Sequence, residues 1–204
     1  MTQELTPGPS NDSVRAAILD SARELFARFG YKKTTMEDIA QSLGKGKSSL
    51  YYYFKNKEEI FQAVVDWEGE ILFSKLRSIV QSPNSADTKM RLYVQVRMEN
   101  IRELQNYHIA IKEDMGGGMD FLDHIKGKYE KTEIEMIQAI MEEGLEKNLF
   151  QLKNTNIAAV AIATALKGLE TPLFKSMNLN NFEEFKVQID NILNILFYGL
   201  IKRS

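Results

Sequence analysis

The sequence contains no cysteine, only four prolines, one tryptophan and two histidines among its 204 residues. Without cysteine the chain has no disulfide framework and no thiolate metal site, which fits a reducing compartment. No uninterrupted apolar run approaches the roughly 18 residues that a membrane-spanning helix needs. The opening stretch, MTQELTPGPSND, lacks the basic and apolar segments of a secretory signal. We therefore expect a cytoplasmic protein that makes no contact with a membrane.

Hydrophobic residues make up 44% of the chain, which is enough for a packed globular core. Apolar residues recur at helical spacing, and neither an alternating strand pattern nor an internal repeat is visible. We therefore expect an all-α fold of about nine helices. Residues 1–13 are expected to form a disordered arm, residues 14–57 a three-helix head, and residues 58–204 a larger helical domain.

The apolar pattern also predicts the helices and their buried faces. In the first helix the predicted buried stripe includes Phe29, and in the long helix after the head Trp67 and Ile71 are expected to face inward. Gly127 is a candidate break in a later helix. The expected helices outside the head motif are 14–29, 57–80, 87–106, 107–115, 119–147, about 156–169 and 181–201.

The charge of the chain is distributed unevenly. Residues 14–57 hold nine Lys or Arg residues and four Asp or Glu residues, a net charge of +5, so the remainder carries −7 of the total of −2. A basic head on an acidic body suits a module that binds a polyanion and is attached to a regulatory domain. The alternative is a chance imbalance on a solvated face.

The most informative stretch runs from Thr35 to Lys57 and predicts two short helices joined by a tight turn. Thr34 or Thr35 can cap the first helix, and Gly44 stands where a residue with positive φ would end it. After the turn Gly44-Lys45-Gly46, the second helix is expected over residues 47–54. This is the layout of a helix-turn-helix motif, at about residues 35–54, whose second helix reads DNA.

These residues resemble the DNA-binding signature of the tetracycline-repressor (TetR/AcrR) family of transcriptional regulators. The resemblance covers about a quarter of the chain, and the remainder is similar to the family only in length and helical character. The chain departs from the family pattern at Lys45, where an aliphatic residue is usual, and at Gly46, where serine is frequent. The matching residues are Ala17, Ala22, Leu25, Phe26, Gly30, Thr34, Thr35, Ile39, Ala40, Gly44, Leu50, Tyr51, Phe54 and Lys57.

The resemblance implies a set of DNA contacts in the head. Thr35, Tyr51, Tyr53 and Lys57 would bind phosphates, and Lys45, Lys47, Ser48, Ser49 and Tyr52 would face the groove. One recognition helix reads only a few base pairs, so a homodimer on a palindromic operator in double-stranded DNA is expected. The family's dimer interface corresponds to the last two helices, and its expected residues here are Ala161, Ala165, Gly168, Phe185, Ile189, Ile192, Leu196 and Leu200.

The resemblance also implies that the larger domain binds a small effector, and its methionine and aromatic residues favour a mostly apolar molecule. For each residue taken separately, however, an ordinary place in the core is favoured over contact with a ligand. Arg97 interrupts an apolar face, so it could bind an anionic group of the effector or form a salt bridge with a neighbour. The candidate lining residues are Trp67, Met90, Tyr93, Val94, Arg97, Met98, Tyr107, Met115, Phe121, Tyr129 and Met136.

Catalytic and metal-binding patterns are absent from the sequence. His108, with Glu113 and Asp114, and His124, with Asp120 and Asp123, lack the two-histidine spacing of a metal site. We therefore expect no enzyme activity, no cofactor and no metal. Gly116–Gly118 is a candidate hinge or loop. The expected function is a dimeric transcriptional regulator, a repressor released by its effector; the alternative is a helical protein-binding adaptor or ligand carrier without specific DNA recognition.

Overall fold

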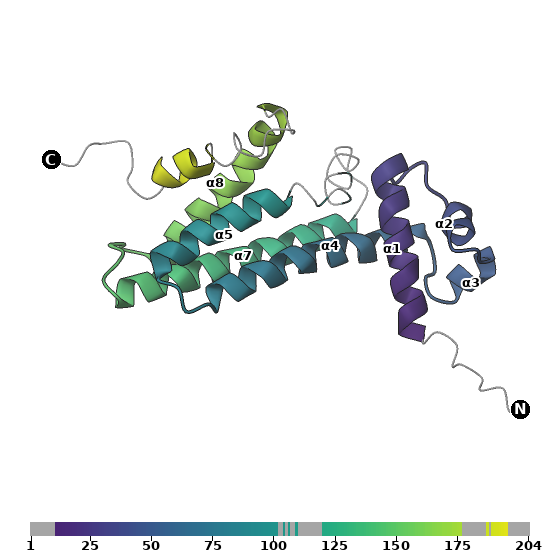
Figure 1. Ribbon diagram of the computed structural model, residues 1–204, viewed down its shortest axis with the longest axis horizontal. Coiled ribbons are helices and arrows are strands. Elements are labelled where there is room, and N and C mark those ends of the chain that lie inside the picture. Colours follow the sequence, from purple (N-terminus) through teal and green to yellow (C-terminus); the bar gives the residue numbers. More distant parts are fainter. Residues whose placement is uncertain are drawn as a thin grey trace, which may run out of the picture. The chain divides into compact units, whose positions relative to one another are not determined.

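The computed structural model describes residues 11–101, 104, 106, 109, 120–176, 187 and 189–195, and these form helices and turns without any strand (Figure 1). The all-α prediction is therefore confirmed. None of the helices in these ranges is long and apolar enough to cross a membrane. The chain divides into two compact units, a head of residues 1–69 and 104–123 and a body of residues 70–103 and 124–204. The domain boundary expected after Lys57 stays a prediction.

The head is built on α1 (Asn11–Phe29), α2 (Met36–Ser42), α3 (Lys47–Tyr51) and the first part of α4 (Lys57–Val80). Its centre is aromatic: the Phe61 ring lies 4.9 Å from Phe26 and 4.7 Å from Tyr31 between centroids. Each helix contributes fully buried apolar side chains, as expected for amphipathic helices around one core. These include Ile18, Ala22, Phe26, Ile39, Leu50, Ile60, Phe61 and Val64.

The first helix differs from its prediction in where it begins and in the exposure of its last residue. It begins at Asn11, three residues before the expected start at Val14. Phe29 was expected on the buried stripe but is 47% exposed. The reason is its position as the last residue of α1, where the chain reverses at Gly30 with a positive φ of 83°. Phe29 therefore lies at the edge of the core and lines a surface groove together with Leu25 and Thr34.

Two residues of α4 that were predicted to face inward are exposed instead. Trp67 is 37% and Ile71 41% exposed, so the prediction that both face inward is wrong. The Arg23 guanidinium covers the Trp67 ring at 5.3 Å from its centroid. The buried position next to Trp67 is taken by Glu68, which is only 4% exposed. Apolar periodicity cannot predict a buried carboxylate, because it depends on a distant polar partner.

That partner is Asn106, which lies beyond α5 in sequence and is fully buried in the head. Its backbone N–H donates to Glu68 Oε2 at 3.1 Å, and its side-chain Nδ2 donates to Glu68 Oε1 at 2.7 Å and to the Arg23 carbonyl at 3.2 Å. Both contacts of the Asn106 side-chain nitrogen are to oxygens, which sets the orientation of the amide, and its Oδ1 has no hydrogen-bond partner among the described residues. Asn106 thus ties α4 to α1 by hydrogen bonds to a buried charge, which are stronger than those between neutral groups.

The body contains the second part of α4, α5 (Ala86–Ile101), most of α7 (Asp120–Glu146) and α8 (Thr155–Ser176). In Figure 1, α5 and the second part of α4 run alongside α7. The Phe73 ring of α4 stacks on Tyr129 of α7 with centroids 4.6 Å apart. The buried apolar residues of the body include Leu72, Leu76, Met90, Val94, Met98, Met136, Ile137, Ile140, Met141, Ala159, Ala163 and Leu166.

Three helices of the body have bounds that differ from the predicted ones. α5 ends at Ile101 rather than near residue 106. α7 continues without a break through Gly127, because one glycine costs only about 1 kcal/mol in a helix interior. α8 extends to Ser176, past Pro172, rather than ending near residue 169. Its start was predicted correctly, since Asn154 Oδ1 caps it by accepting from the Ile157 N–H at 2.9 Å.

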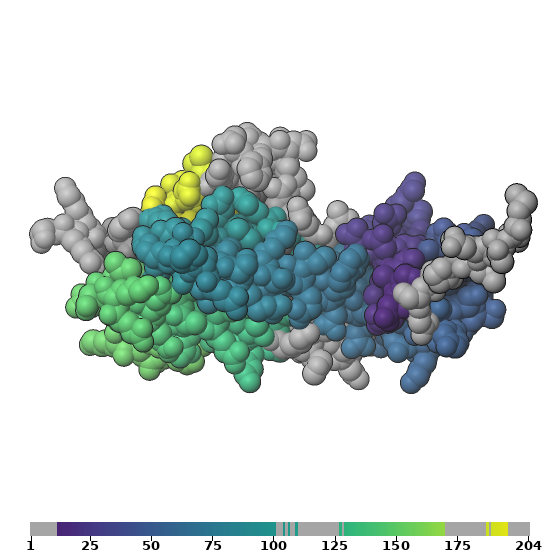
Figure 2. All heavy atoms as spheres, turned by 60° about the horizontal axis from the view of Figure 1, so that its bottom comes forward, coloured from purple at the N-terminus to yellow at the C-terminus, as the bar shows by residue number. Residues whose placement is uncertain are grey.

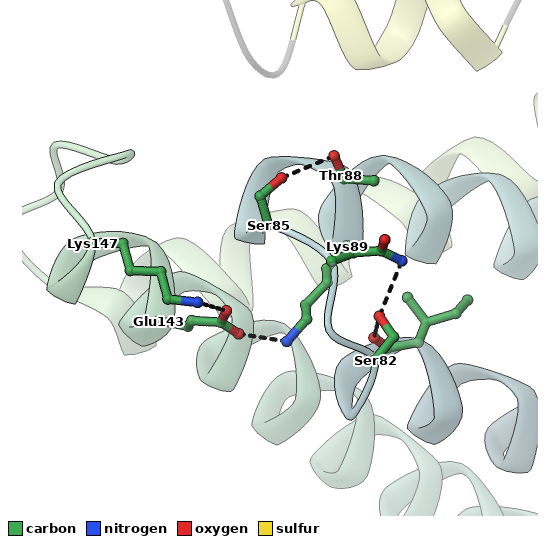
Figure 3. A network of polar contacts seen from close by, with 8 residues as sticks. Ser82, Ser85, Thr88, Lys89, Glu143 and Lys147 are labelled. Atoms are coloured by element: carbon green, nitrogen blue, oxygen red, sulfur yellow. Dashed lines mark hydrogen bonds and ion pairs between the residues drawn. The ribbon is translucent and has the colours of Figure 1, made fainter.

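A polar network joins α5 to the end of α7 (Figure 3). Lys89 is 6% exposed, and its Nζ donates to Glu143 Oε2 at 2.6 Å, while Lys147 Nζ donates to the other oxygen at 2.6 Å. Hydrogen bonds from Lys147, and next from Lys89, lower the pKa of Glu143. Glu143 therefore stays charged near neutral pH and holds the two helices together at this point.

The end of α7 is closed by a tight turn. Asn148 has a φ of 55°, its N–H donates to the Leu145 carbonyl at 3.0 Å, and the Leu149 N–H donates to the Gly144 carbonyl at 2.8 Å. This is a Schellman motif with asparagine at the left-handed position. The turn brings the Phe150 ring back onto Gly144, where an added Cβ would lie 2.1 Å from the ring.

We expect Gly144→Ala to lower the free energy of unfolding by about 1–3 kcal/mol, because the new methyl group would overlap the Phe150 ring. Gly127→Ala is the matched control on the same helix, since nothing lies within 4 Å of its Cβ position. That control should stabilise the protein by about 0.5–1 kcal/mol. Urea denaturation of both variants tests the pair, and equal midpoints would show that Phe150 does not pack on Gly144.

Candidate nucleic-acid interface

The first helix of the motif is capped as the sequence indicated. Thr35 Oγ1 accepts from the Asp38 N–H at 3.2 Å, and the Thr35 N–H donates to Asp38 Oδ2 at 2.8 Å. This reciprocal capping box lowers the pKa of Asp38, mainly through its hydrogen bond with the Thr35 hydroxyl. Thr34, the other candidate cap, is instead buried, and its hydroxyl donates to the Gly30 carbonyl at 2.9 Å.

The turn between the two helices depends on glycine. Gly44 has a φ of 64°, its N–H donates to Gln41 at 3.0 Å, and the Lys45 N–H donates to Ala40 at 2.9 Å. This Schellman motif ends α2 in the left-handed conformation that glycine adopts without strain. Gly46 then stands at the N-cap of α3 in an extended conformation, without a side-chain cap. The turn is therefore compatible with Lys45 and Gly46 despite their departure from the expected pattern.

The recognition helix α3 is short and presents most of its residues to solvent. Its regular part covers Lys47–Tyr51, but the Tyr53 and Phe54 N–H groups still bond to the Leu50 carbonyl, at 2.9 and 3.0 Å. Leu50 and Phe54 are buried and hold α3 on the head. Tyr52 is 76% exposed. The predicted DNA-contact residues that are exposed are Thr35, Lys45, Lys47, Ser48, Ser49, Tyr51 and Tyr52.

The other two predicted DNA contacts, Tyr53 and Lys57, are half-buried. The Tyr53 ring packs edge-on against Tyr52, with centroids 5.0 Å apart. Lys57 Nζ donates to the Tyr31 carbonyl at 2.8 Å and lies 4.3 Å from the Tyr31 ring centroid. The structure thus engages the Lys57 ammonium inside the head, while its role as a phosphate contact stays a prediction.

Glu37, in the first turn of α2, also belongs to this surface, and the sequence did not indicate its partner. Its carboxylate forms an ion pair with Lys47 of α3, and the Lys47 ammonium also lies 5.8 Å from the Tyr51 ring centroid. Their mutual hydrogen bond is the main cause that lowers the pKa of Glu37 and raises that of Lys47. Glu37 therefore keeps a negative charge beside the most exposed part of the motif and competes with any anion for Lys47.

We expect Glu37→Gln to tighten binding to duplex DNA by about 3- to 10-fold at low salt, because it frees Lys47 and removes a charge that repels phosphate. Glu24→Gln changes the charge of the head equally, at an exposed position of α1. Fluorescence anisotropy with labelled duplex DNA at several salt concentrations compares the two variants. Equal affinities would show that only the net charge of the head matters.

The body brings together a second group of predicted residues. Tyr93, Arg97 and Met98 of α5 are buried, and so are Tyr129 and Met136 of α7. Met90 and Val94 are also buried in this unit. Trp67 belongs to the head, where it is exposed. Tyr107, Met115, Phe185, Leu196, Leu200, His108, the segment Gly116–Gly118 and the side chains of Phe121 and His124 lie outside the described residues.

Arg97 takes the second of its two predicted roles, a salt bridge to a neighbour. Its Nε donates to Glu133 Oε1 of α7 and its Nη2 donates to Glu133 Oε2 at 3.3 Å. The two side chains are 5% and 10% exposed, so this is a two-point ion pair inside the core. The interruption of the apolar face by Arg97 indicated a partner, but the sequence did not identify Glu133.

Tyr93 is the exception among the polar groups of this core. It is fully buried, and its hydroxyl has no hydrogen-bond partner among the described residues. Burial first, and then the Glu133 carboxylate, raise the pKa of Tyr93 well above its ordinary value, against an opposing effect of Arg97. A buried hydroxyl without a partner costs about 1–3 kcal/mol, so a native protein rarely keeps one without a reason.

The predicted dimer residues differ in exposure. Ala161 and Gly168 of α8 are exposed, Ala165 and Ile192 are half-buried, and Ile189 is buried. On α8 the exposed residues form one stripe at helical spacing, and its largest side chain, Ile157, is 66% exposed. The stripe consists of Ile157, Val160, Ala161, Thr164 and Gly168. No group of His, Asp or Glu residues in the described part of the chain could hold a metal ion.

The head matches a known family model. Residues 18–64 match the model described as bacterial regulatory proteins, tetR family. This range contains the end of α1, the capped α2, the glycine turn, α3 and the first turns of α4. The match therefore covers the elements that build the exposed recognition helix.

Relatives and solved structures extend the comparison beyond the head. The chain is 32% identical over 115 residues to the HTH-type transcriptional repressor KstR2 of Rhodococcus jostii (strain RHA1), an alignment that covers 54% of this chain and 56% of that protein. The chain thus spans about half the length of this curated relative. It is 27% identical to the crystal structure of a transcriptional regulator from Cytophaga hutchinsonii ATCC 33406, with a TM-score of 0.71 over 89% of this chain and 93% of that one.

A further solved structure is similar in fold. The crystal structure of AibR in complex with isovaleryl coenzyme A and operator DNA has a TM-score of 0.66 to this chain. It covers 90% of this chain and 97% of AibR, at 18% identity. At that identity the likeness concerns the fold alone.

Proposed function

We propose that this chain, which belongs to the TetR family of bacterial regulatory proteins, is a homodimeric transcriptional repressor that binds a palindromic operator and is released from it by a mostly apolar effector. The observation that carries the proposal is the exposed face of α3 on a helix-turn-helix whose first helix has a capping box and whose turn is closed at Gly44. The similar proteins are transcriptional regulators and not enzymes, which supports a regulatory role.

The DNA contacts proposed for the head follow from its exposed residues. Lys45 and Lys47 supply positive charge, Ser48 and Ser49 are small donors that allow close approach, and Tyr52 projects furthest into solvent. Lysines near a phosphate backbone give affinity that falls with salt, whereas contacts to base edges give sequence preference. We therefore assign phosphate contacts to Thr35 and Tyr51, and groove contacts to Lys47, Ser48, Ser49 and Tyr52. Lys45, which the resemblance places in the groove, lies in the turn before α3, and we assign it a phosphate contact.

The exposed stripe of α8 supports a homodimer. An apolar helix face that stays uncovered in one protomer is a candidate for burial against another protein surface. The small residues Ala161 and Gly168 would allow a second helix to approach closely. A two-fold dimer of this kind presents two recognition helices to two half-sites of a palindrome.

The body supports the effector part of the proposal. Met90, Met98 and Met136 are buried, and the side chain of methionine adapts to irregular apolar ligands. AibR, which shares the fold, was solved with both isovaleryl coenzyme A and operator DNA. A fold of this kind can therefore provide both a small-molecule site and a DNA-binding surface.

Selection of bound sequences from random duplex DNA, repeated at two salt concentrations, tests the proposal. We expect a palindrome whose affinity falls steeply as salt rises, since the basic head attracts the phosphate backbone. Recovery of one half-site only would contradict the dimer. Recovery of no sequence preference, with weak binding at both salt concentrations, would contradict the repressor and favour the alternative of a helical adaptor or ligand carrier.

A further inference from the structure

The core of the body holds a polar group that makes no hydrogen bond within the described part of the chain. The Tyr93 hydroxyl is buried between α5 and α7 and has no hydrogen bond to any residue that the structure describes. Phenylalanine would fill the same space without this penalty. The hydroxyl is therefore expected to gain a partner in another state of the protein.

The charges beside Tyr93 determine which partner fits. Arg97 and Glu133 are bound to each other through two hydrogen bonds, and Arg97 Nη1 points to the Met98 sulfur at 3.5 Å. An incoming carboxylate would have to displace Glu133, and an incoming cation would have to displace Arg97. Both exchanges break a buried ion pair and are costly. The site therefore favours a group without charge.

The hydroxyl itself determines the hydrogen-bonding role of that group. Because burial raises the pKa of Tyr93, the phenol stays protonated and can donate. The buried phenol hydrogen is satisfied only by an acceptor, such as a carbonyl or ester oxygen. Donation from the phenol to such an oxygen would satisfy the hydroxyl without disturbing Arg97 or Glu133.

The helices and side chains near Tyr93 indicate what the rest of the ligand is like. Figure 2 shows the body from a second side, and within it α5 is joined to α7 by the ion pairs Lys89–Glu143 and Arg97–Glu133. The buried side chains of these two helices include Met90 and Met98 on α5 and Met136 on α7. Methionine has three rotatable side-chain bonds, so these side chains can repack to admit an apolar chain.

We propose that the Tyr93 hydroxyl is the hydrogen-bond donor that recognises an uncharged carbonyl or ester oxygen of an otherwise apolar ligand bound in the body. The ligand's role as the effector that releases DNA rests on the proposed function, but its binding at Tyr93 does not. Tyr93 is thus the residue that selects neutral ketones and esters over the corresponding carboxylates.

The test uses the full chain and its Tyr93→Phe variant. The probes are the methyl ketones from 2-hexanone to 2-dodecanone and the carboxylates from hexanoate to dodecanoate, with binding followed by calorimetry and by the thermal midpoint. We expect ketones to bind the wild type more tightly than carboxylates, and Tyr93→Phe to weaken ketone binding about tenfold. The variant should be at least as heat-stable as the wild type, because it loses a buried unpaired hydroxyl.

Tyr31→Phe is the control, since Tyr31 belongs to the aromatic centre of the head and is not among the candidate lining residues. It should change ketone affinity by less than about threefold, which is within the effect expected for a remote side chain. The proposal is overturned if wild type and Tyr93→Phe bind ketones equally, if carboxylates bind more tightly, or if no ketone in the series binds. If the protein binds no specific DNA sequence, the proposed function is overturned instead. The ketone measurements then still decide whether Tyr93 recognises the ligand.

Discussion

Replacing Glu133 with alanine should lower the free energy of unfolding by about 3–5 kcal/mol, because it leaves the Arg97 charge in the core without this carboxylate. Arg97 is 5% and Glu133 10% exposed, so water cannot readily replace the lost partner. The ion pair also joins α5 to α7, two helices far apart in sequence. Urea denaturation followed by circular dichroism measures the change.

The control for this prediction replaces both partners. Arg97→Met together with Glu133→Leu removes both charges and keeps apolar volume, so its stability should lie within about 1 kcal/mol of the wild type or above it. The two single variants and the double variant form a thermodynamic cycle that isolates the pair. If Glu133→Ala costs less than about 1 kcal/mol, the pair is exposed to solvent in the folded protein and the described core is wrong.

Lys47→Ala and Tyr52→Ala should each weaken binding to the selected operator about tenfold, because both side chains extend from the exposed face of α3. The two variants should differ in how strongly their binding to the operator depends on salt. Loss of Lys47 removes a charge and lowers the salt dependence of binding, whereas loss of Tyr52 removes a contact surface and leaves the salt dependence nearly unchanged. Anisotropy titrations at several salt concentrations separate the two effects.

Two controls accompany these variants. Lys153→Ala removes the same charge at an exposed position of the body and should leave operator binding unchanged. Tyr52→Phe keeps the ring, so it distinguishes a contact made by the ring from one made by the hydroxyl. Thermal midpoints should match the wild type, because neither Lys47 nor Tyr52 is buried. Unchanged operator affinity in both alanine variants would refute the assignment of α3 as the recognition helix.

The sequence by itself determined the features of the head that depend on near neighbours. Thr35 with Asp38, Gly44, and Asn56, whose Oδ1 accepts from the Glu59 N–H at 2.8 Å, all end or begin helices where their residue types indicate. Caps and turns are specified by residues within a few positions of each other, so they can be read locally. The family resemblance rested on the same local spacing.

Burial on a helix face was less predictable from the sequence. The 3.6-residue period places Ile18, Ala22 and Phe26 correctly, but it also placed Phe29 and Trp67 inside, and both are exposed. The period gives the direction of a side chain around its own helix. It does not say where a neighbouring helix ends, and that decides whether the side chain is covered.

Only the tertiary structure decided the buried polar groups: Glu68 meets Asn106, Arg97 meets Glu133, and the Tyr93 hydroxyl has no partner among the residues that the structure describes. The paired residues lie 38 and 36 positions apart, and no spacing rule connects them. Their burial is possible only because each charge meets a partner delivered by another part of the chain, since an isolated charge in the core would be prohibitive. Local sequence therefore indicates where the proposed DNA-reading surface lies, while packing between distant helices decides which polar groups face each other in the core.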